Sequence, residues 1–251
     1  MIEQSRRGDI AVLTMAHGKA NALDIELLEA ITAQFDKLRG APDRAVVLTG
    51  QGRMFSAGVD LPPLADGGPD YVRRFLPALH RLYETVFFFA KPVVAAVNGH
   101  AIAGGCVLQC CADKRIAARG DFRIGVTELL VGVPFPAMAF EVMRFATAPQ
   151  YFADGILSGA TYPPDVALQR GLVDETVEPA QLLDRAIAAA KTLAALPPGT
   201  FEMTKRQIRQ PAADAMERHA PRIDKVAEEI WTSSATIAHI RDYVARTFKK
   251  G

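Results

Sequence analysis

Two short apolar runs flank a helix-length amphipathic segment near the start of the chain. Residues 10–15 and 45–48 are apolar runs of strand length. Residues 24–40 lie between them and place large apolar side chains at helical spacing, after a possible N-cap at Asp24 and before Gly40, which can end a helix. A strand, a helix and a strand in this order favour a right-handed βαβ unit with parallel strands. The uninterrupted apolar run at 45–48 is typical of a strand covered on both faces. The pattern therefore predicts an α/β fold.

The periodicity changes near residue 180. Before that point, further strands are predicted at residues 93–97 and 115–118, and helices at residues 71–89, 104–111 and 134–146. The Gly/Pro-rich residues 50–69 predict a long loop, and loops of that length are usually functional. We expect an α/β core over residues 1–180 and a helical C-terminal region over residues 181–251.

Composition excludes several classes of protein. Hydrophobic residues make up 49% of the chain and charged residues 23%, as in globular and not in disordered chains. A net charge of +1 gives no electrostatic footprint for long nucleic acids. The longest apolar stretch, residues 129–140, contains two prolines and is shorter than the roughly 20 residues of a membrane helix. We expect neither nucleic acid nor a membrane as a partner.

The N-terminus and the cysteines bear on the compartment. Residues 1–8 contain no apolar run typical of a leader. Cys106, Cys110 and Cys111 are odd in number and too close together for a disulfide framework. These features predict a reducing, cytoplasmic location. No histidine lies at ligand spacing from another histidine or a cysteine, so no metal site is expected.

Two glycine-bearing segments follow predicted strands: MFSAGVDL at residues 54–61 and NGHAIAGGC at residues 98–106. Glycine allows the backbone to turn N–H groups outward, and two such groups aimed at one oxygen would form an oxyanion hole. The second segment also opens a predicted helix, whose dipole adds positive character. Two ordinary glycine turns would have the same spacing. Motifs of nucleophile elbows, phosphate-binding loops and dinucleotide-binding folds are absent from the sequence.

Together the two segments resemble the crotonase (enoyl-CoA hydratase/isomerase) superfamily, whose members carry F-x-A-G-x-D-[IL] and, later, N-G-x-A-x-G-G. FSAGVDL and NGHAIAGG match both motifs. Three other stretches are also similar to family segments: HGKANALDIELLEAI, SGATYPPDVALQRGLVDETV (in which Pro164 replaces a family alanine) and PPGTFEMTKRQIRQ. The resemblance implies a crotonase-like spiral of ββα units with a C-terminal helical region. In the family this region drives assembly into a homotrimer, often paired as a homohexamer.

The resemblance also implies a binding site for an acyl-CoA thioester and no separate cofactor. By position, the N–H groups of Val59 and Gly104 match the oxyanion hole that binds the thioester oxygen. The groove for coenzyme A would be lined by Ala20, Ala57, Asp60 and Leu61.

The catalytic side chains depart from those of two-glutamate hydratases. Val107 stands where those enzymes have their first glutamate, and only Glu128 matches the second. The segment IGVTELLVG around Glu128 resembles that of single-glutamate Δ3,Δ2-enoyl-CoA isomerases. One base that removes a proton from C2 and returns it to C4 is enough to move a double bond. The apolar neighbours of Glu128 would raise its pKa, whereas a surface glutamate on a loop is the alternative.

These observations predict an enoyl-CoA isomerase. An enoyl-CoA hydratase and an acyl-CoA-binding protein without turnover are the alternatives. For other residues we expect structural roles. His100 is interpreted as structural or solvent-facing, residues 87–89 as packing or acyl-pocket wall, and Asp113 as a cap or surface group. The basic side chains within residues 205–209 are interpreted as solvated charge, with a contact to the CoA phosphates as the alternative.

Overall fold

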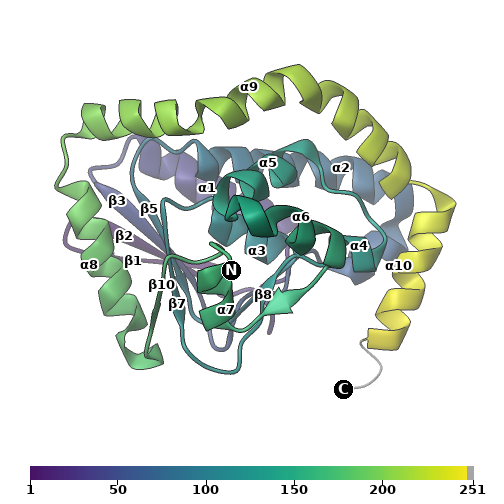
Figure 1. The fold of residues 1–251 in the computed structure, drawn as a ribbon, viewed down its shortest axis with the longest axis horizontal. Coiled ribbons are helices and arrows are strands. Elements are labelled where there is room, and N and C mark those ends of the chain that lie inside the picture. The colour runs from purple at the N-terminus through teal and green to yellow at the C-terminus, as the bar shows by residue number, and fades with distance from the viewer. Residues whose placement is uncertain (248–251) are drawn as a thin grey trace.

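The computed structural model describes residues 1–247 and contains two sheets surrounded by helices (Figure 1). The strands are β1 (Ile2–Arg7), β2 (Ile10–Met15), β3 (Ala45–Gly50), β4 (Met54–Ser56), β5 (Val93–Val97), β6 (His100–Ile102), β7 (Lys114–Ala118), β8 (Ile124–Gly125), β9 (Thr161–Tyr162) and β10 (Glu175–Val177). The helices are α1 (Ile25–Arg39), α2 (Leu61–Phe87), α3 (Gly104–Cys110), α4 (Glu128–Val131), α5 (Ala137–Ala146), α6 (Pro149–Ser158), α7 (Pro164–Gln169), α8 (Leu182–Ala194), α9 (Pro198–Trp231) and α10 (Ser234–Thr247), with a 3₁₀ turn at Pro179–Gln181.

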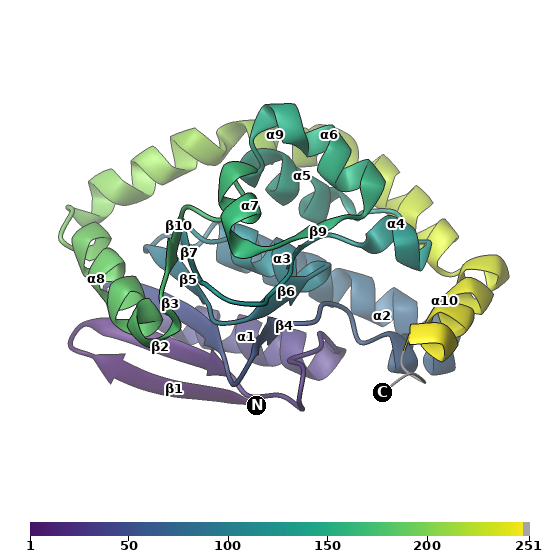
Figure 2. The ribbon, with the colours of Figure 1, turned by 60° about the horizontal axis from the view of Figure 1, so that its bottom comes forward.

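The chain winds between the two sheets as a spiral (Figure 2). The larger sheet has the order β1-β2-β3-β5-β7-β10 and the smaller one the order β4-β6-β8-β9. Strands β3, β5 and β7 enter the larger sheet, and β4, β6 and β8, which follow them along the chain, enter the smaller one. Helices α2, α3 and α4 follow these pairs. The predicted spiral of ββα units is confirmed.

Both faces of the larger sheet are covered. From β2 to β10 each strand pairs in parallel with its neighbour, and alternate residues of β3 enter two different apolar clusters. Val46 and Leu48 join the cluster that contains α1 and α2, while Ala45 and Val47 join the cluster that contains α8. Burial on both faces explains why the strands read as uninterrupted apolar runs.

The first strand was missed by the sequence analysis. β1 forms an antiparallel hairpin with β2, pairing Ile2 with Met15. Five of its six residues are exposed, so its sequence, IEQSRR, shows no alternation of apolar and polar side chains. An edge strand of this kind is held by its neighbour's backbone, and composition alone does not reveal it.

The predicted loop at residues 50–69 is wrong in part. Its middle forms β4, and α2 starts at Leu61, with Pro62 and Pro63 in the first turn. Proline is tolerated there because the first N–H groups of a helix have no partner within the helix. The helix bends at Gly68, whose φ of 59° and ψ of −151° are not helical, just before Pro69.

The C-terminal helices fold back on their own chain. Helix α8 packs on the larger sheet, and α9 and α10 lie across α5 and α2 (Figure 1). Trp231 at the end of α9 is 1% exposed, and its Nε1 donates to the carbonyl of Pro134 at 2.9 Å. The apolar face of the tail therefore packs into the core of the same chain. Phe248, predicted as part of the last helix, lies outside the described residues.

Within residues 1–247, no helix combines the length and the apolar character that crossing a membrane requires.

Candidate active site

The segment at residues 57–60 crosses from β4 to α2 beside the loop that precedes α1. The amide of Leu23 donates to the carbonyl of Gly58 at 2.7 Å, and the amide of Asp60 donates to the carbonyl of Leu23 at 3.0 Å. In a trans peptide the N–H points opposite to the C=O, so the N–H of Val59 points away from Leu23. Among the described residues it donates to no backbone carbonyl.

The start of α3 presents a second unused amide. The carbonyl of Ala103 accepts from the amides of Cys106 and Val107, at 2.8 and 3.1 Å, and therefore points into the helix. The N–H of Gly104 belongs to the same peptide and points the opposite way, out of the helix N-terminus. Ala103 has a φ of 49°, a conformation that costs free energy for a residue with a side chain.

Three glycines allow these two segments to meet. A Cβ on Gly58, whose φ is 83°, would lie 3.0 Å from the amide nitrogen of Gly104 and 2.6 Å from the carbonyl oxygen of Ile102. A Cβ on Gly105 would lie 2.5 Å from the carbonyl oxygen of Ser56. A Cβ on Gly104 would lie 3.7 Å from Cγ2 of Val59. The structure thus brings Val59 and Gly104, the two predicted N–H donors, side by side, and only glycine fits at the points of closest approach.

Two buried polar side chains hold the first segment, and the sequence analysis missed both. Nδ2 of Asn21 donates to the carbonyls of Met54 and Phe55, both at 3.2 Å. Oγ of Ser56 donates to the carbonyl of Asn21 at 2.7 Å and accepts from the amide of Gly58 at 3.1 Å. The serine in FSAGVDL was a visible signal, because a polar side chain next to a buried strand needs a partner.

Glu128 is buried at the start of α4. The residue is 8% exposed, and its Oε2 has no hydrogen-bond partner among the described residues. Burial raises the pKa of Glu128 to about 7, although the backbone amides of Glu128 and Thr127 partly oppose this by favouring the ionised form. The other buried carboxylates of the described chain, Asp43 and Glu141, pair with Arg6 and Arg144. Glu128 forms no ion pair with any residue from 1 to 247 and is a candidate for proton transfer.

The surroundings of Glu128 are apolar and close to the two amides. Burial raises the pKa of Tyr83, and the contact with Cys110 together with burial raises the pKa of Cys106; the charge of Glu128 adds to both shifts, so Glu128 lies near both groups. Tyr83 in turn donates a hydrogen bond to the carbonyl of Gly104 at 3.0 Å. Val107, in the first part of α3, is fully buried. The site therefore combines two N–H groups that have no backbone acceptor within the described residues with one buried carboxyl.

The residues matched to the coenzyme A groove lie in two neighbouring segments. Ala20 lies in the loop before α1, and Ala57, Asp60 and Leu61 lie where the chain passes from β4 into α2. The amide of Ala57 donates to the carbonyl of Ala20 at 2.9 Å, and both residues are half-buried. Asp60 precedes the first turn of α2, and burial and the charge of Asp24 raise its pKa. Leu61 differs from the other three because its side chain is buried in the apolar core.

His100, residues 87–89 and the cysteines make the structural contacts that were expected of them. Nδ1 of His100 accepts from the amide of Arg123 at 3.2 Å. Phe87 and Phe89 are fully buried, and Phe87 packs edge-on against Phe145, 5.2 Å between ring centres. All three cysteines are free and buried in or next to α3.

The predictions for Asp113 and for the basic residues of α9 were wrong in part. Lys205 and Arg209 are buried and contact the Asp113 carboxylate at 2.7 and 2.8 Å. Asp113 also accepts from the amide of Val93 at 2.8 Å. Arg206 is exposed, as expected. The two buried cations tie α9 to the sheet because their partner lies at the start of β7, about 90 residues earlier, a distance that sequence patterns do not reveal.

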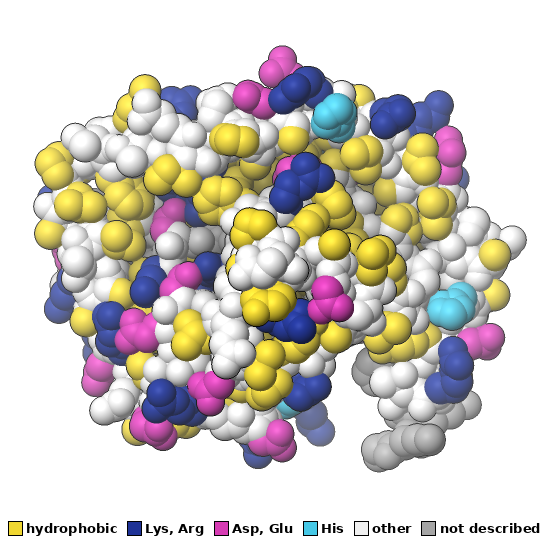
Figure 3. Space-filling model, in the orientation of Figure 1, with side chains coloured by type: hydrophobic (Ala, Val, Ile, Leu, Met, Phe, Trp, Pro, Cys, Tyr) yellow, Lys and Arg dark blue, Asp and Glu magenta, His cyan; other side chains and the backbone are white. Residues whose placement is uncertain are grey.

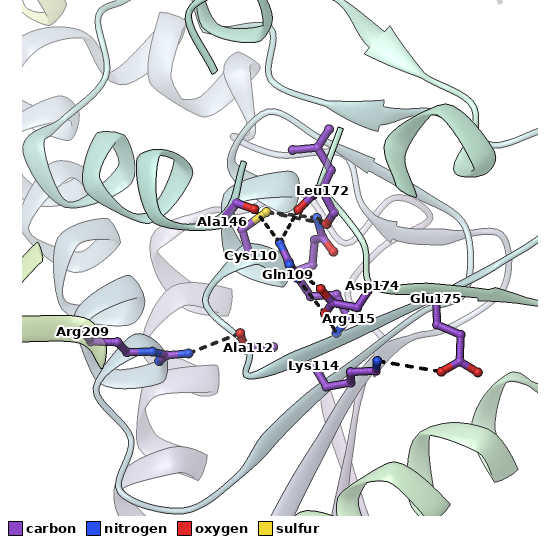
Figure 4. A network of polar contacts seen from close by, with 11 residues as sticks. Gln109, Cys110, Ala112, Lys114, Arg115, Ala146, Leu172, Asp174, Glu175 and Arg209 are labelled. Carbon is purple, nitrogen blue, oxygen red and sulfur yellow. Dashed lines mark hydrogen bonds and ion pairs between the residues drawn. The ribbon is translucent and has the colours of Figure 1, made fainter. Parts of the chain in front are cut away.

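A network of polar contacts holds the C-terminal end of α3 (Figure 4). Nε2 of Gln109 donates to the carbonyl of Leu172 at 2.9 Å, and Arg209 donates to the carbonyl of Ala112 at 3.3 Å. Arg115 forms a two-point ion pair with Asp174, with contacts of 3.1 and 2.6 Å. These contacts fix the helix whose other end carries Gly104.

One group of side chains has the composition of a metal site. Single ligand atoms of His17, Asp24 and Glu26 lie within 4.8 Å of one another. Nε2 of His17 is 2.7 Å from Oδ2 of Asp24, and Oδ1 of Asp24 caps α1 by accepting from Leu27. The side chains of His17 and Asp24 are thus already engaged in hydrogen bonds within the protein.

Comparison with known proteins identifies relatives along most of the chain. The family model for enoyl-CoA hydratase/isomerase matches residues 5–239. Enoyl-CoA delta isomerase 1 of mouse mitochondria is 29% identical over 218 residues, covering 85% of this chain and 75% of the mouse protein. A putative enoyl-CoA hydratase of Thermus thermophilus is 33% identical over 210 residues and covers 82% of each chain.

Solved structures agree with the sequence matches. The crystal structure of human mitochondrial delta3-delta2-enoyl-CoA isomerase superimposes with a TM-score of 0.94 over 99% of this chain and 98% of the human chain. At 24% identity this likeness shows a shared fold. The family match, the bacterial relative and the fold lead to one conclusion: the chain belongs to the enoyl-CoA hydratase/isomerase family.

Proposed function

We propose that the protein is a Δ3,Δ2-enoyl-CoA isomerase in which Glu128 is the only acid–base group. The observation that carries the proposal is a single buried carboxyl without a basic partner, whose pKa is raised to about 7, beside two free amides. Val107 is buried at the position that matches the first glutamate of the family's two-glutamate hydratases.

The proposed reaction starts with the thioester oxygen of a 3-enoyl-CoA bound by the N–H groups of Val59 and Gly104. The carboxylate of Glu128 removes a proton from C2, and the electron pair moves into a dienolate whose negative oxygen faces the two N–H donors. The protonated Glu128 then delivers the same proton to C4, which yields the 2-enoyl-CoA. A group with a pKa near 7 accepts and returns a proton at neutral pH with little bias in either direction.

Coenzyme A is proposed to bind along Ala20, Ala57, Asp60 and Leu61, with Leu61 contributing its backbone because its side chain is buried. Ala57, Asp60 and Leu61 flank Val59 in one segment, and Ala20 is held beside it by the hydrogen bond from the amide of Ala57. No cofactor beyond the thioester substrate is needed for the proton transfer described above.

Hydration of a 2-enoyl-CoA is the second candidate, and the Thermus relative, named a putative enoyl-CoA hydratase, favours it. Hydration needs a positioned water and a proton donor. Val107 offers neither a donor nor an acceptor to water, so the site supports isomerisation better.

Product analysis separates the candidates. The wild-type protein is given a 3-enoyl-CoA and, separately, a 2-enoyl-CoA, and the products are resolved by chromatography. We expect 2-enoyl-CoA from the first and little 3-hydroxyacyl-CoA from the second, and we expect Glu128→Gln to abolish the first reaction while still binding thioester. Rapid hydration that survives Glu128→Gln would overturn both the reaction and the role of Glu128. Binding without any turnover would indicate an acyl-CoA-binding protein.

We also propose assembly into a homotrimer or homohexamer. Helices α4 to α7 lie on the face shown in Figure 3, on which apolar side chains are widespread. Exposed large apolar side chains on these helices are Leu129, Leu130, Phe145, Leu157 and Leu168. Contiguous exposed apolar surface is typical of an interface. Sedimentation velocity at micromolar concentration tests this, and a purely monomeric protein would contradict it.

The proposed location is the cytoplasm, on the basis of three free, buried cysteines. Fractionation of the source cells with an antibody to the protein tests the proposal.

A further inference from the structure

Tyr83 places a hydroxyl group in the apolar core beside the proposed oxyanion hole. It lies on the buried face of α2 and is 1% exposed. Its Oη donates to the carbonyl of Gly104 at 3.0 Å. A Cβ on Gly104 would lie 2.8 Å from this same oxygen, so the phenol also contacts the α-carbon side of the glycine.

Packing alone does not explain the hydroxyl. A phenylalanine would fill nearly the same volume without burying a polar atom, which is unfavourable unless the atom is hydrogen-bonded. The carbonyl of Gly104 is in the first turn of α3, where it accepts from the amide four residues later, so it needs no second donor. The bond from Tyr83 is therefore an addition to a carbonyl that is already satisfied.

The hydrogen bond from Tyr83 acts directly beside the peptide that carries the N–H of Gly104. The peptide that carries the N–H of Gly104 lies between two anchored neighbours: the amide of Ala103 donates to the carbonyl of Gly125 at 2.8 Å, and the carbonyl of Gly104 accepts from Tyr83. Ala103 has a positive φ of 49°, which persists only when the surroundings hold it. The carbonyl of the same peptide, that of Ala103, accepts two bonds from the first turn of α3, and Tyr83 anchors the next peptide; we expect loss of the Tyr83 bond to let the turn relax and to change the direction of the N–H.

We infer that Tyr83 is a positioning residue of the oxyanion hole, whose hydroxyl keeps the N–H of Gly104 aimed at the thioester oxygen. This inference rests on the proposed function of the site. Tyr83 acts through Gly104 and not on the substrate oxygen, because its one hydroxyl hydrogen is already donated to the glycine carbonyl.

The test is Tyr83→Phe, read out with 4-dimethylaminocinnamoyl-CoA. This thioester absorbs at longer wavelength when its carbonyl is polarised, so the shift on binding reports the oxyanion hole directly. It has no removable hydrogen at C4 and cannot isomerise. We expect the variant to bind the probe with an affinity within about twofold of the wild type but with a smaller shift. Because a misaligned donor costs less than the 10²–10³ in rate of a lost one, we expect kcat for a 3-enoyl-CoA to fall about tenfold with KM nearly unchanged.

The matched control is Tyr162→Phe, which removes another buried phenol hydroxyl, one without a hydrogen-bond partner. It should leave the shift and kcat as in the wild type. Incorporation of 3-fluorotyrosine at position 83 keeps the donor and should retain the wild-type shift, so a folding defect of Tyr83→Phe does not decide the outcome. A Tyr83→Phe protein with the full wild-type shift would overturn the inference, as would a fluorotyrosine protein that folds but loses the shift.

The two proposals fail in different ways. If the wild-type protein shifts the probe but does not isomerise a 3-enoyl-CoA, the proposed reaction is wrong while the role of Tyr83 in the hole is still measured by the shift. If isomerisation is found and the shift is unaffected by Tyr83→Phe, only the positioning role is wrong.

Discussion

Replacing Glu128 with glutamine should make the protein more stable at alkaline pH while removing its proposed activity. Glu128 is 8% exposed and has no cationic partner within residues 1–247, so its ionised form is disfavoured in the folded protein. Glutamine has nearly the same size and cannot ionise. A residue kept for chemistry at the expense of stability is expected to behave in this way.

The size of the effect follows from the pKa of Glu128, which burial raises from 4.5 to about 7. At 1.36 kcal/mol per pH unit this corresponds to about 3 kcal/mol. The folded protein retains the proton at pH values at which the unfolded chain has lost it. The contribution to stability is therefore complete below pH 4.5, is lost as the pH rises to about 7, and stays lost above it. Glu128→Gln should thus add about 3 kcal/mol at pH 8 and little at pH 4.5.

Urea unfolding at the two pH values measures this difference, and the higher stability should also appear as a rise in Tm of roughly 6–12 °C at pH 8 for a chain of this size. Glu29→Gln is the control, because Glu29 is exposed on α1 and forms no ion pair within the described residues. A Glu128→Gln protein no more stable than the wild type at pH 8 would refute the claim that burial disfavours the ionised carboxylate.

Three further predictions concern the site. Isomerisation kcat/KM should rise with pH and level off above about 7, because Glu128 must be ionised to accept the C2 proton; a profile that is flat from pH 5 to 9 would contradict this. Val59→Ala should keep most activity, whereas Gly104→Pro, which removes an N–H donor, should lose about 10²–10³ in rate. Since proline also restricts Ala103 before it, circular dichroism must show that the variant folds. Val107→Glu should destabilise the protein and add weak hydration of a 2-enoyl-CoA.

The order of elements was largely predictable because burial on both faces leaves a strong trace in the sequence. The runs at 45–48 and 93–97 are apolar throughout, and the structure places their alternate residues in different clusters. β1 and the first turns of α2 left no such trace. The first is an exposed edge strand, and the second is a helix that starts with Leu61 followed by two prolines.

The positions of the proposed hole were predictable because each donor is set by a short local motif with glycine at the turn. What supports those motifs was not predictable. The hydrogen bonds from Asn21 to Phe55 and from Tyr83 to Gly104 join residues 34 and 21 positions apart. Such partners are chosen by the way segments pack, and a single sequence shows only that a polar side chain sits on an apolar face.

In the proposed site the backbone binds the thioester oxygen and a side chain moves the proton, and this division of tasks bears on what the fold can catalyse. In the proposed site the N–H donors come from the backbone of Val59 and Gly104, so stabilisation of an enolate would depend on the chain path and not on side chains. The reaction class then depends on which ionisable side chains face that enolate. A second carboxylate at Val107 would share the desolvated pocket of Glu128, where each charge raises the cost of the other. With valine there, the proposed site has Glu128 as its one ionisable carboxyl among the described residues. Moving a proton between two carbons of one substrate is the chemistry that such a pocket supports best.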